Sequence, residues 1–561
     1  MSLGLVADFE TTTNPDDCRV WAWAVADIET ESMIAYDTDI QSFFRFIATY
    51  DKVMCYFHNL SFDAAFMFDY LLKHNYVHVD SRRLKPREFT TLISDDGNHY
   101  SVKIMFGNKH TVEFRDSLKL IPLPVAKIPE AFNLSDSKLD IDYTADRPIG
   151  HTLTVDEVDY IESDVVIVAK ALHVQLNVGM RKMTVGSNSL AEYKRMTTEF
   201  TTLFPILDIE IDTDIRRAYR GGFTYRSTRF PREIIGPGRV FDVNSLYPSV
   251  MYDRLLPYGV PIWRDGPPAP DEYYPLFIVS LTMTAKLKRD HIPCIQLRHS
   301  SFYVQTEYQT LIDEPVTLYA TNVDLALWSD HYDIDVLEYH GGWYFQGATG
   351  MFCRYIDKWS KVKAEHTGGM RTIAKLYLNS LYGKFATNPV VGSKYPVLDG
   401  DKVRLVTGES ETRKPVYTAM GVFITAYARD VTIRAAQNHY DIFAYADTDS
   451  LHLITDSDPV DLDIHPTRLG AWKREYIFEQ ALFLRAKAYL EYTGVHNCAR
   501  LDGEHARGCG FETHIAGLPV SIGDQLEFDD IKHGVTIPGK LLPTRVNGGI
   551  VLREVGYTIK Y

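Results

Sequence analysis

Acidic side chains in the first third of the chain stand at spacings that would bring them together. Asp8 and Glu10 end an apolar run, and because side chains alternate along a strand, both point to one face of it. Tyr160 and Asp164 lie four residues apart, which places them on one face of a helix. With Asp63, three separate elements supply four carboxylates and a phenol. Such a set could hold two divalent cations and activate a water for phosphodiester hydrolysis.

Each of these pairs, taken singly, occurs by chance in many proteins. A solvated strand edge or a surface helix would account for any one of them. Their order along the chain, and their positions at the ends of apolar elements where α/β active sites lie, instead favour a metal-dependent hydrolytic site.

The segment FAYADTDSLHL at 443–453 holds two further acids in a tight turn between β-like arms. Asp447 and Asp449 would repel one another there without a cation. Asp242, which follows a strand-like segment, offers a third acid, and a backbone carbonyl could supply another oxygen ligand. The alternative is an Asx-rich hairpin turn without metal. We favour a metal site because a cationic helix accompanies these acids.

That helix is predicted between residues 371 and 383. Its stripe at intervals of four, four and three consists of Arg371, Lys375, Asn379 and Tyr382. Its opposite face, which can be buried, carries Ile373, Leu376 and Leu381. A merely solvated face would more often include acids. A cationic face can bind the phosphates of a nucleotide while metals held by acids neutralise developing charge, so the pattern indicates phosphoryl transfer.

The elements that would position these groups form two units. In the first, residues 3–7 and 20–25 predict a two-strand hairpin, 52–57 a further buried strand, and the segment after it a helix. A Thr cap with Glu three residues later begins a helix across 154–182. These elements make a mixed α/β unit over 1–183.

A connector with Ser, Thr and Asn clusters follows over 184–215. The second unit contains a proline-rich stretch that we interpret as irregular, a long helix pattern across 351–386, and a terminal β-rich subdomain from about 518. No repeat of 20 to 50 residues and no low-complexity tract is present, which excludes solenoids and propellers.

The chain of 561 residues has a formal net charge of −15, with 45% hydrophobic and 24% charged residues, as in an ordinary globular protein. An acidic surplus argues against a nucleic-acid partner, but its distribution argues for one. Residues 358–384 hold six Lys/Arg and one Glu, and residues 531–561 hold five and one. Such local positive charge favours contacts with phosphate.

Six scattered cysteines without a C-x-x-C pair make a disulfide framework unexpected and favour a reducing compartment. A zinc site made from Cys498, His505, Cys509 and His514 would have spacings that match no common motif, so we interpret these residues as structural. No signal peptide and no membrane-spanning apolar run is readable. We therefore expect a protein of the cytoplasm of whatever cell makes it, without a membrane partner.

Eight short motifs appear in a recognisable order. They are DFETT at 8–12, HNLSFD at 58–63, YIESD at 160–164, YRGGF at 219–223, DVNSLYP at 242–248, KLYLNSLYG at 375–383, YADTDS at 445–450 and KAY at 487–489. Together they resemble the family B DNA polymerases, most closely the protein-primed enzymes of small phages with linear genomes. Any one motif alone would be weak, whereas the ordered set is specific.

The resemblance implies an α/β and α+β multidomain fold. A ribonuclease H-like 3′–5′ exonuclease domain would span 1–183, and a right-hand polymerase domain with two insertions would span 216–561. Within the latter, the resemblance implies an insertion at 254–350 that docks a terminal protein, fingers at 351–389, a second insertion at 390–415 that wraps template and product, a palm at 416–516 and a thumb at 517–561. The long stretches between the polymerase motifs fit these insertions.

In the exonuclease part, the resemblance implies that Asp8, Glu10, Asp63 and Asp164 bind two metals and that Tyr160 orients the water. The single-stranded primer end would contact Thr11, His58, Asn59, Phe66, Ser117, Leu118 and Lys138.

In the polymerase part, the resemblance implies metal ligation by Asp242, Asp449, the carbonyl of Val243 and, in support, Asp447. Lys375 and Arg371 would hold the triphosphate, and Arg371 departs from the Lys of close relatives, which could change phosphate geometry. Tyr247 would exclude a 2′-hydroxyl, and Tyr382 and Asn379 would complete the pocket of the nascent pair. DNA would contact Tyr219, Gly221, Gly222, Thr448, Lys487 and Tyr489.

We therefore expect a phage DNA-templated DNA polymerase that is protein-primed, displaces strands and proofreads, with two Mg²⁺ or Mn²⁺ per active site. Its partners would be template and primer DNA, dNTPs and a terminal protein, and it would be a monomer or a heterodimer with that protein. A conventionally primed family B polymerase is the alternative. Three other functions fit the sequence less well. A nucleic-acid-binding protein with degenerate sites should have lost some of the acids. A stand-alone nuclease would not need the second acid set, and an RNA polymerase would not need Tyr247.

Overall fold

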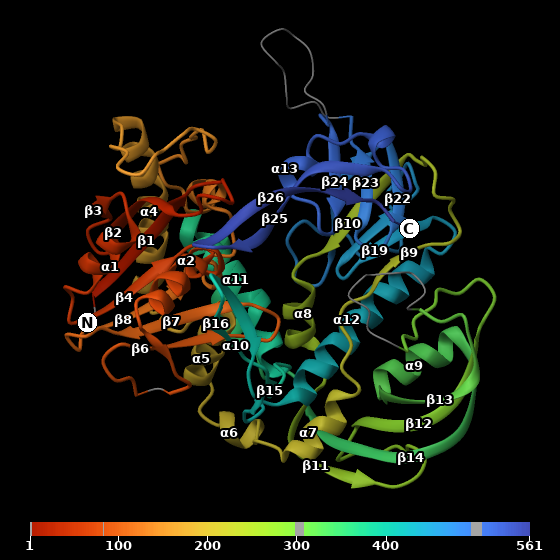
Figure 1. Cartoon of the computed structure of the whole chain (residues 1–561). Coiled ribbons are helices and arrows are strands. Elements are labelled where there is room, and N and C mark those ends of the chain that lie inside the picture. Colours follow the sequence, from red (N-terminus) through yellow and green to blue (C-terminus); the bar gives the residue numbers. More distant parts are fainter. Residues whose placement is uncertain (1–2, 82, 298–307, 495–507, 561) are drawn as a thin grey trace.

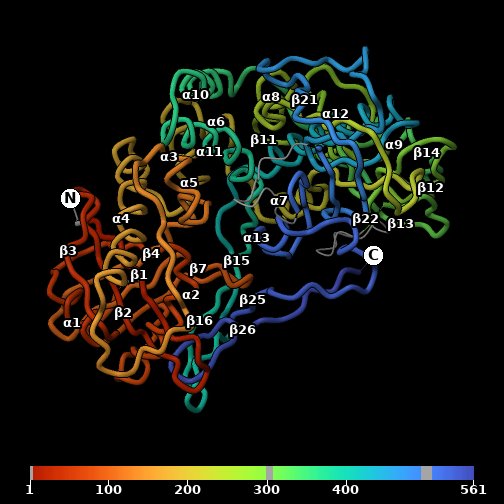
Figure 2. The backbone as a smooth tube through the Cα atoms, turned by 90° about the horizontal axis from the view of Figure 1, so that it is seen from above, coloured from red at the N-terminus to blue at the C-terminus, as the bar shows by residue number. Residues whose placement is uncertain are grey.

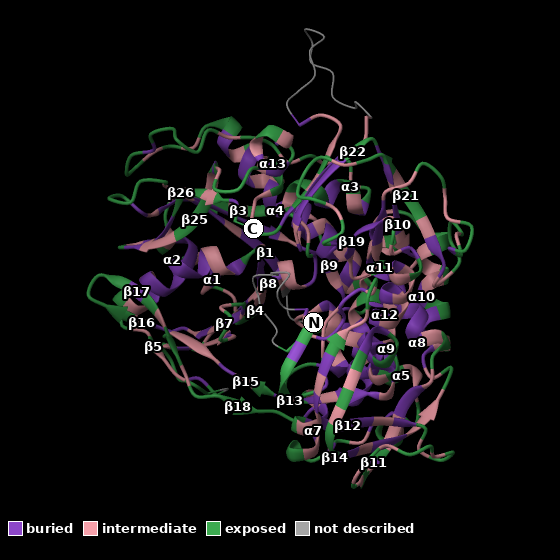
Figure 3. Ribbon diagram, turned by 90° about the vertical axis from the view of Figure 1, so that its right-hand side faces the viewer, coloured by how far each residue is buried: buried purple, intermediate pink, exposed green. Residues whose placement is uncertain are grey.

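A computed structural model of the chain describes residues 3–81, 83–297, 308–494 and 508–560. Its N-terminal unit lies to one side of Figure 1, in red and orange, and the strands and helices of the later sequence form the other side. Buried positions concentrate in the sheets and in α12 (Thr418–Asn438), whereas the long terminal hairpin of β25 (Thr536–Val546) and β26 (Gly549–Thr558) exposes much of its length (Figure 3).

The N-terminal unit is built on an eight-stranded sheet with the order β3-β2-β1-β4-β8-β7-β6-β5. Its strands are β1 (Leu3–Thr11), β2 (Val20–Asp27), β3 (Ser32–Asp37), β4 (Lys52–Phe57), β5 (Val77–His78), β6 (Glu88–Ile93), β7 (His99–Met105) and β8 (Thr111–Asp116). The strands β1, β4 and β8 run parallel, and β1 pairs antiparallel with β2 as the hairpin prediction requires.

Helices cover both faces of this sheet. Alternate residues of β1 show this: Leu5 and Ala7 pack with α1 (Ile40–Ile47) and α2 (Leu60–Lys73), and Val6 packs with α4 (Val155–Asn177). Asp8 and Glu10 share the alternation of Val6, so the fold directs both acids toward α4.

Local capping signals in this unit were readable from the sequence. Thr154 and Glu157 form the expected capping box at the start of α4, which satisfies backbone N–H groups of its first turn. Shorter elements join β8 to α4, namely η1 (Ser117–Lys119), η2 (Val125–Lys127) and α3 (Ile128–Phe132).

The segment that the sequence indicates as a connector is largely helical. It contains α5 (Val185–Met196), α6 (Phe200–Leu203) and α7 (Ile209–Arg216). Helix α5 packs along α11 (Gly368–Phe385), and buried Glu192 forms an ion pair with Lys358 of α10 (Cys353–Glu365). The segment is therefore a folded support between the two units.

A five-stranded antiparallel sheet with the order β21-β10-β20-β19-β9 forms the centre of the second unit. Its strands are β9 (Thr224–Arg226), β10 (Gly238–Val243), β19 (Phe443–Asp447), β20 (Ser450–Leu453) and β21 (Trp472–Phe478). Helices α8 (Leu246–Asp253) and α12 (Thr418–Asn438) pack against each other, and α12 also contacts β19 and β20. A smaller sheet of β22 (Gln480–Arg485), β23 (Ala488–Tyr492) and β24 (Phe511–Ile515) adjoins it.

The proline-rich stretch is a regular strand in part, so the interpretation as irregular is wrong there. Pro257 and Pro261 lie in β11 (Leu256–Arg264), an edge strand of the sheet β11-β14-β12-β13. An edge position tolerates proline because one side of the strand needs no N–H donor. The other strands are β12 (Leu276–Leu287), β13 (Leu311–Thr321) and β14 (Tyr332–Ala348), with α9 (Asn322–His331) packed on them.

The predicted long helix across 351–386 is two helices. These are α10 (Cys353–Glu365) and α11 (Gly368–Phe385), and the chain turns between them at Gly368, which has a φ of +56°. Short strands follow, namely β15 (Val390–Val391), β16 (Lys394–Asp399), β17 (Lys402–Thr407) and β18 (Glu411–Thr412).

The terminal segment contains α13 (Val520–Gly523), η4 (Phe528–Asp530) and a hairpin of β25 (Thr536–Val546) and β26 (Gly549–Thr558). Figure 2 shows the hairpin reaching across to α2 and β16. At its tip, Lys73 Nζ donates to Asn547 Oδ1 at 2.7 Å, and Asn547 also forms a β-bridge with Lys402. The tip therefore touches both the N-terminal unit and the β16–β17 hairpin.

Four cysteines, Cys18, Cys55, Cys294 and Cys353, are free thiols. Cys509 is disulfide-bonded, so its sulfur is not a zinc ligand here. Cys498 and His505 lie outside the described residues, and His514 stacks on Tyr489. Among the described residues, no helix is both long and apolar enough to cross a membrane.

Two candidate catalytic sites

The first acid set gathers at the end of β1, and we call it the N-terminal acidic site (Asp8, Glu10, Asp63 and Asp164). The carboxylate oxygens of Asp8, Glu10 and Asp164 lie within 4.8 Å of one another. Asp63 belongs to the first turn of α2 and is 3% exposed. The fold thus brings together the acids that the sequence predicted.

Burial and mutual repulsion make these acids hard to ionise. Burial first, and then the charge of Asp164, raises the pKa of Asp8 to about 7. Burial first, and then the charge of Asp8, raises the pKa values of Glu10 and Asp63 well above their usual range. Lys138 Nζ lies 2.6 Å from Asp164 Oδ2, and one ammonium cannot balance four carboxylates.

Free acceptor atoms in the N-terminal acidic site fit a bound cation. Asp63 Oδ1 and Asp164 Oδ1 are buried without a hydrogen-bond partner among the described residues. Buried carboxylate oxygens rarely stay unpaired, and hard oxygen donors are the ligands that Mg²⁺ and Mn²⁺ prefer. The donor set therefore fits divalent metal.

A tyrosine that the sequence reading missed completes this site. Tyr143, in the loop before α4, shares a hydrogen bond of 2.6 Å with the phenol of Tyr160. Tyr160 is buried beside Glu10 and Asp164, and it is held by this bond. Tyr143 belongs to no regular element and to no motif, so only the tertiary structure reveals it.

Several predicted contacts for a DNA end meet at the ends of β4 and β8. Asn59 N–H and Leu118 N–H both donate to Asp116 Oδ1 at 3.0 Å. His58 Nε2 lies 2.8 Å from the carbonyl oxygen of Leu123, and its Nδ1 lies 2.9 Å from Ser117 Oγ. Burial lowers the pKa of His58, which favours its neutral form.

A cavity of about 550 Å³ opens onto the N-terminal acidic site. Its lining includes the predicted contacts Thr11, His58, Asn59 and Lys138. It also includes residues of the terminal hairpin, namely Leu541, Ile550, Val551 and Leu552. Phe66 is not among the lining residues, because it is 2% exposed and packs on Gly549, where an added Cβ would lie 2.5 Å from the ring.

The second acid set lies where β10 meets the β19–β20 turn, and we call it the C-terminal acidic site (Asp242, Asp447 and Asp449). Asp242 pairs with Ser450 across the strands, and Val243 N–H donates to Asp449 O at 2.9 Å. Burial first, and then the charge of Asp449, raises the pKa of Asp242 to about 7. Burial likewise raises the pKa of Asp449. A divalent cation would relieve the repulsion between these buried carboxylates, whose hard oxygen atoms are suitable ligands for it.

Asp447 differs from its neighbours because it already has partners. It forms an ion pair with Lys487 and accepts a hydrogen bond from Thr224 Oγ1 at 3.0 Å. Lys487 N–H in turn donates to the phenol of Tyr445. Tyr489 is buried and stacks on His514. The two acids of the YADTDS turn therefore have different surroundings.

The cationic stripe of α11 faces outward as the periodicity predicted. Arg371, Lys375 and Asn379 are exposed, and Tyr382 is half-buried. On the opposite face Ile373 and Leu381 are buried, whereas Leu376 is only partly so. The ring of Tyr382 stacks on Tyr247 with centroids 3.9 Å apart. This stack joins α11 to α8 beside the acids.

Lys363 of α10 is a third cation at this place, and the sequence reading missed it. Its Nζ lies 3.4 Å from Ser245 Oγ. Burial first, and then the charges of Lys375 and Arg371, lowers its pKa, and Asp242 acts in the opposite sense. Because Lys363 is on another helix, the stripe of α11 could not indicate it.

The YRGGF segment packs directly on the YADTDS turn. A Cβ on Gly222 would lie 2.7 Å from Thr448 Oγ1, so only glycine fits there. Arg429 Nη1 donates to the carbonyls of Arg220 and Gly221 at 2.8 and 3.0 Å. Tyr219 is partly exposed on the same segment.

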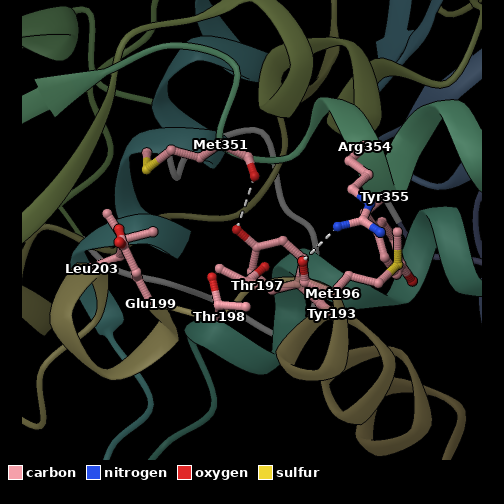
Figure 4. A pocket seen from close by; sticks show the side chains of 9 residues that line it. All are labelled: Tyr193, Met196, Thr197, Thr198, Glu199, Leu203, Met351, Arg354 and Tyr355. Carbon is pink, nitrogen blue, oxygen red and sulfur yellow. Dashed lines mark hydrogen bonds between the residues drawn. The ribbon is translucent and has the colours of Figure 1, made fainter.

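A second cavity, of about 260 Å³, lies between the connector helices and α10 (Figure 4). Its polar side chains include Glu199 and Arg354, and the latter donates to Met196 O at 3.5 Å. Since it holds a single acid, it is not a metal site.

The sequence and the fold match those of a known family. The family model described as DNA polymerase type B, organellar and viral, matches residues 45–154 and 137–463. The chain belongs to this family.

Among individual relatives, the DNA polymerases of Bacillus phage M2 and Bacillus phage phi29 are 43% and 42% identical over 571 residues. These alignments cover 99% of this chain and 99% and 98% of the two relatives. The structure of phi29 DNA polymerase complexed with primer-template DNA superposes with a TM-score of 0.92 at 40% identity, over 100% of both chains. The complex with primer-template DNA and incoming nucleotides gives 0.91. The resemblance read from the motifs is confirmed, as is a mixed α/β multidomain fold.

Proposed function

We propose that the protein is a phage DNA-directed DNA polymerase with 3′–5′ exonuclease activity, which works in the cytoplasm of the host cell. The observation that carries the proposal is the presence of two separate acid sets in a chain that matches phi29 DNA polymerase over its whole length. In this proposal the N-terminal unit is the ribonuclease H-like exonuclease domain. The later sequence supplies palm, fingers and thumb.

At the N-terminal acidic site, the cavity admits a single-stranded DNA end. Mg²⁺ or Mn²⁺, two per site, would supply charge neutralisation and an activated water when bound. Asp8, Glu10, Asp63 and Asp164 hold these cations. Tyr160, fixed by Tyr143, orients the water, and Lys138 offsets negative charge beside Asp164.

At the C-terminal acidic site, Asp242, Asp449 and the carbonyl of Val243 hold the cations. Arg371, Lys375 and Lys363 converge on the space facing Asp242, where a triphosphate would neutralise them. Tyr247 lies below the position of the sugar and excludes a 2′-hydroxyl. Tyr382 and Asn379 line the pocket for the new base pair.

The hairpins beyond the fingers suit contact with duplex product. The tip of β25–β26 bridges to β17 through Asn547 and Lys402, and both hairpins touch α2. The net positive charge of residues 531–561 places cations along this bridge. A closed contact of this kind would hold template and product, as strand displacement without a helper requires.

The sheet of β11–β14 is the proposed docking place of a terminal protein. Its strands β13 and β14 expose the acids Asp313, Glu314, Asp335 and Glu338. Acidic surfaces steer and orient basic partners, so the docked face of the terminal protein should be basic. The polymerase would then be a monomer or a heterodimer with that protein.

The test is incubation with labelled dATP, Mg²⁺ or Mn²⁺, and a candidate terminal protein. A covalent adduct of protein and nucleotide is expected, and Asp449→Ala should abolish it. Normal extension of an oligonucleotide primer without any adduct would overturn protein priming and favour a conventionally primed polymerase. Loss of both reactions in the unaltered protein would overturn the polymerase assignment itself.

A further inference from the structure

The turn that carries Asp447 and Asp449 is strained. Asp449 N–H donates to the carbonyl of Asp447 at 2.7 Å, which closes a three-residue γ-turn. Its central residue, Thr448, has a φ of +62°. A γ-turn with positive central φ is rare and strained, and a β-branched residue in this region is an outlier. Such strain persists only where neighbouring groups hold it.

Three neighbours hold Thr448 in place. Its N–H donates to the carbonyl of Phe223 at 2.6 Å, and its own carbonyl accepts from Thr432 Oγ1 at 2.6 Å. Gly222 packs against its side chain so closely that a Cβ would clash. The two backbone contacts come from the YRGGF segment and from α12, on either side of the turn.

Thr432 can act on substrate only through this turn. It is fully buried on α12, and its hydroxyl lies 3.3 Å from the carbonyl of Ala428 as well. The hydroxyl has one proton, and the shorter contact directs it to Thr448 O. Within the described residues, no contact joins Thr432 to a carboxylate of the C-terminal acidic site.

We propose that Thr432 is a positioning residue for polymerisation, which clamps the γ-turn against the YRGGF backbone and so fixes the directions of Asp447 and Asp449. This inference rests on the proposed polymerase site. It gives the YRGGF segment a second role, because Gly222 and Phe223 form the other side of the clamp. Replacing a residue that orients a metal ligand commonly lowers metal affinity or activity by about 10- to 100-fold.

The first experiment compares Thr432→Val with Thr432→Ser. Valine keeps the shape and loses the hydroxyl, and serine keeps the hydroxyl. We expect Thr432→Val to lower kcat for nucleotide addition roughly 10-fold and to raise the Mg²⁺ concentration for half-maximal addition severalfold, with Thr432→Ser near the unaltered enzyme. Degradation of single-stranded DNA should not change in either variant. Equal loss in both variants, or equal loss of both activities, would overturn the clamp.

The second experiment measures stability without metal, and it uses Thr448→Gly to relieve the strain. Glycine adopts positive φ freely, so a relaxed turn needs less clamping. Thr432→Val should lower the melting temperature of the metal-free protein clearly more in the Thr448 background than in the Thr448→Gly background. Equal shifts in the two backgrounds would contradict the proposal. If Asp449→Ala left nucleotide addition intact, the polymerase site would be misplaced, and that outcome is separate from failure of the clamp.

Discussion

The two acidic sites differ in how their charge is balanced. In the N-terminal acidic site, three carboxylates lie within 4.8 Å of one another, and Lys138 pairs with one of them. In the C-terminal acidic site, Asp447 is paired with Lys487, and cations of α10 and α11 face Asp242. The N-terminal acidic site therefore has an excess of negative charge, whereas the C-terminal acidic site has negative and positive side chains on separate elements.

This difference suits the two proposed reactions. Hydrolysis needs a cation, a water and a DNA end, so a site that draws cations by itself is sufficient. Nucleotide addition should occur only after the nucleotide that pairs with the template has bound. Among the described residues Arg371, Lys375 and Lys363 form no ion pair, so a triphosphate would balance their charge when it arrives. The stacked Tyr247 and Tyr382 lie beside the place proposed for it. We infer that the first site is assembled in advance and that substrate completes the second.

The strongest test of this separation removes one acid from each site. Asp449→Ala should lower nucleotide addition by more than about 1000-fold, because it removes one of the proposed metal ligands at the reacting phosphate. Degradation of single-stranded DNA should remain. Asp8→Ala should have the reverse effect. Gel assays of primer extension and of primer degradation on the same preparations measure both activities.

Folded controls are needed for these variants. A melting temperature close to that of the unaltered protein would show that each variant is folded. If a folded variant lost both activities, the two sites would not be independent.

A smaller effect is expected at Tyr247. Tyr247→Val removes the ring that would meet a 2′-hydroxyl, so incorporation of ribonucleotides relative to deoxyribonucleotides should rise by roughly 10- to 100-fold. Single-nucleotide addition with matched dNTP and NTP gives the ratio of kcat/KM values. Tyr247→Phe, which keeps the ring, is the matched control. Unchanged discrimination in the valine variant would contradict the assignment.

Local patterns predicted much of the molecule. The β1–β2 hairpin, the capping box at Thr154 and the stripe of α11 follow from alternation, capping and helical spacing, which involve residues near in sequence. The acids of both sites could be proposed from local spacing, because Asp8 and Glu10 alternate along β1 and Asp447 and Asp449 stand at the β19–β20 turn. These features depend on few long-range contacts.

Features that depend on distant parts of the chain could not be predicted. The spacing of α11 contains no information on Lys363, which reaches the same space from α10. Phe66 is covered by Gly549, hundreds of residues later. The strain at Thr448 contradicts its local preference and persists only because of Thr432 and the YRGGF segment. Tertiary packing decides each of these cases.

A further variant tests whether cations of α10 and α11 await the triphosphate. Lys363→Ala should raise KM for dNTPs by about 10-fold, since one charge-assisted contact with phosphate is lost. Activity on single-stranded DNA should be unchanged. Lys361→Ala is the matched control, because Lys361 is exposed on the same helix and its Nζ lies 3.9 Å from a Glu365 carboxylate oxygen. Equal effects of the two variants would show that Lys363 has no special place.

The smallest expected effect concerns stability and pH in the absence of metal. The folded protein holds a proton on Asp8 up to about pH 7, whereas an unfolded aspartic acid releases it near pH 4. Because the folded state binds more protons in this interval, its stability should fall as pH rises from about 4 to 7, by about 1 to 3 kcal/mol. Saturating Mg²⁺ should reduce the slope, since a cation replaces the protons. Melting temperatures measured across this pH range in the presence of a chelator give the slope.

Substituting one acid in each site would show which of the two sites has the larger excess of negative charge. Asp8→Asn should flatten the pH dependence, because burial and repulsion raise the pKa of three acids together in the N-terminal acidic site. Asp242→Asn should flatten it less, although the pKa of Asp242 is also raised to about 7. The reason is that, next to burial, the charge of Asp8 raises the pKa values of Glu10 and Asp63 as well, whereas the raised pKa of Asp449 comes from burial and Asp447. If Asp242→Asn had the larger effect, the site that we describe as completed by substrate would hold the greater uncompensated charge, and the comparison between the two sites would be reversed.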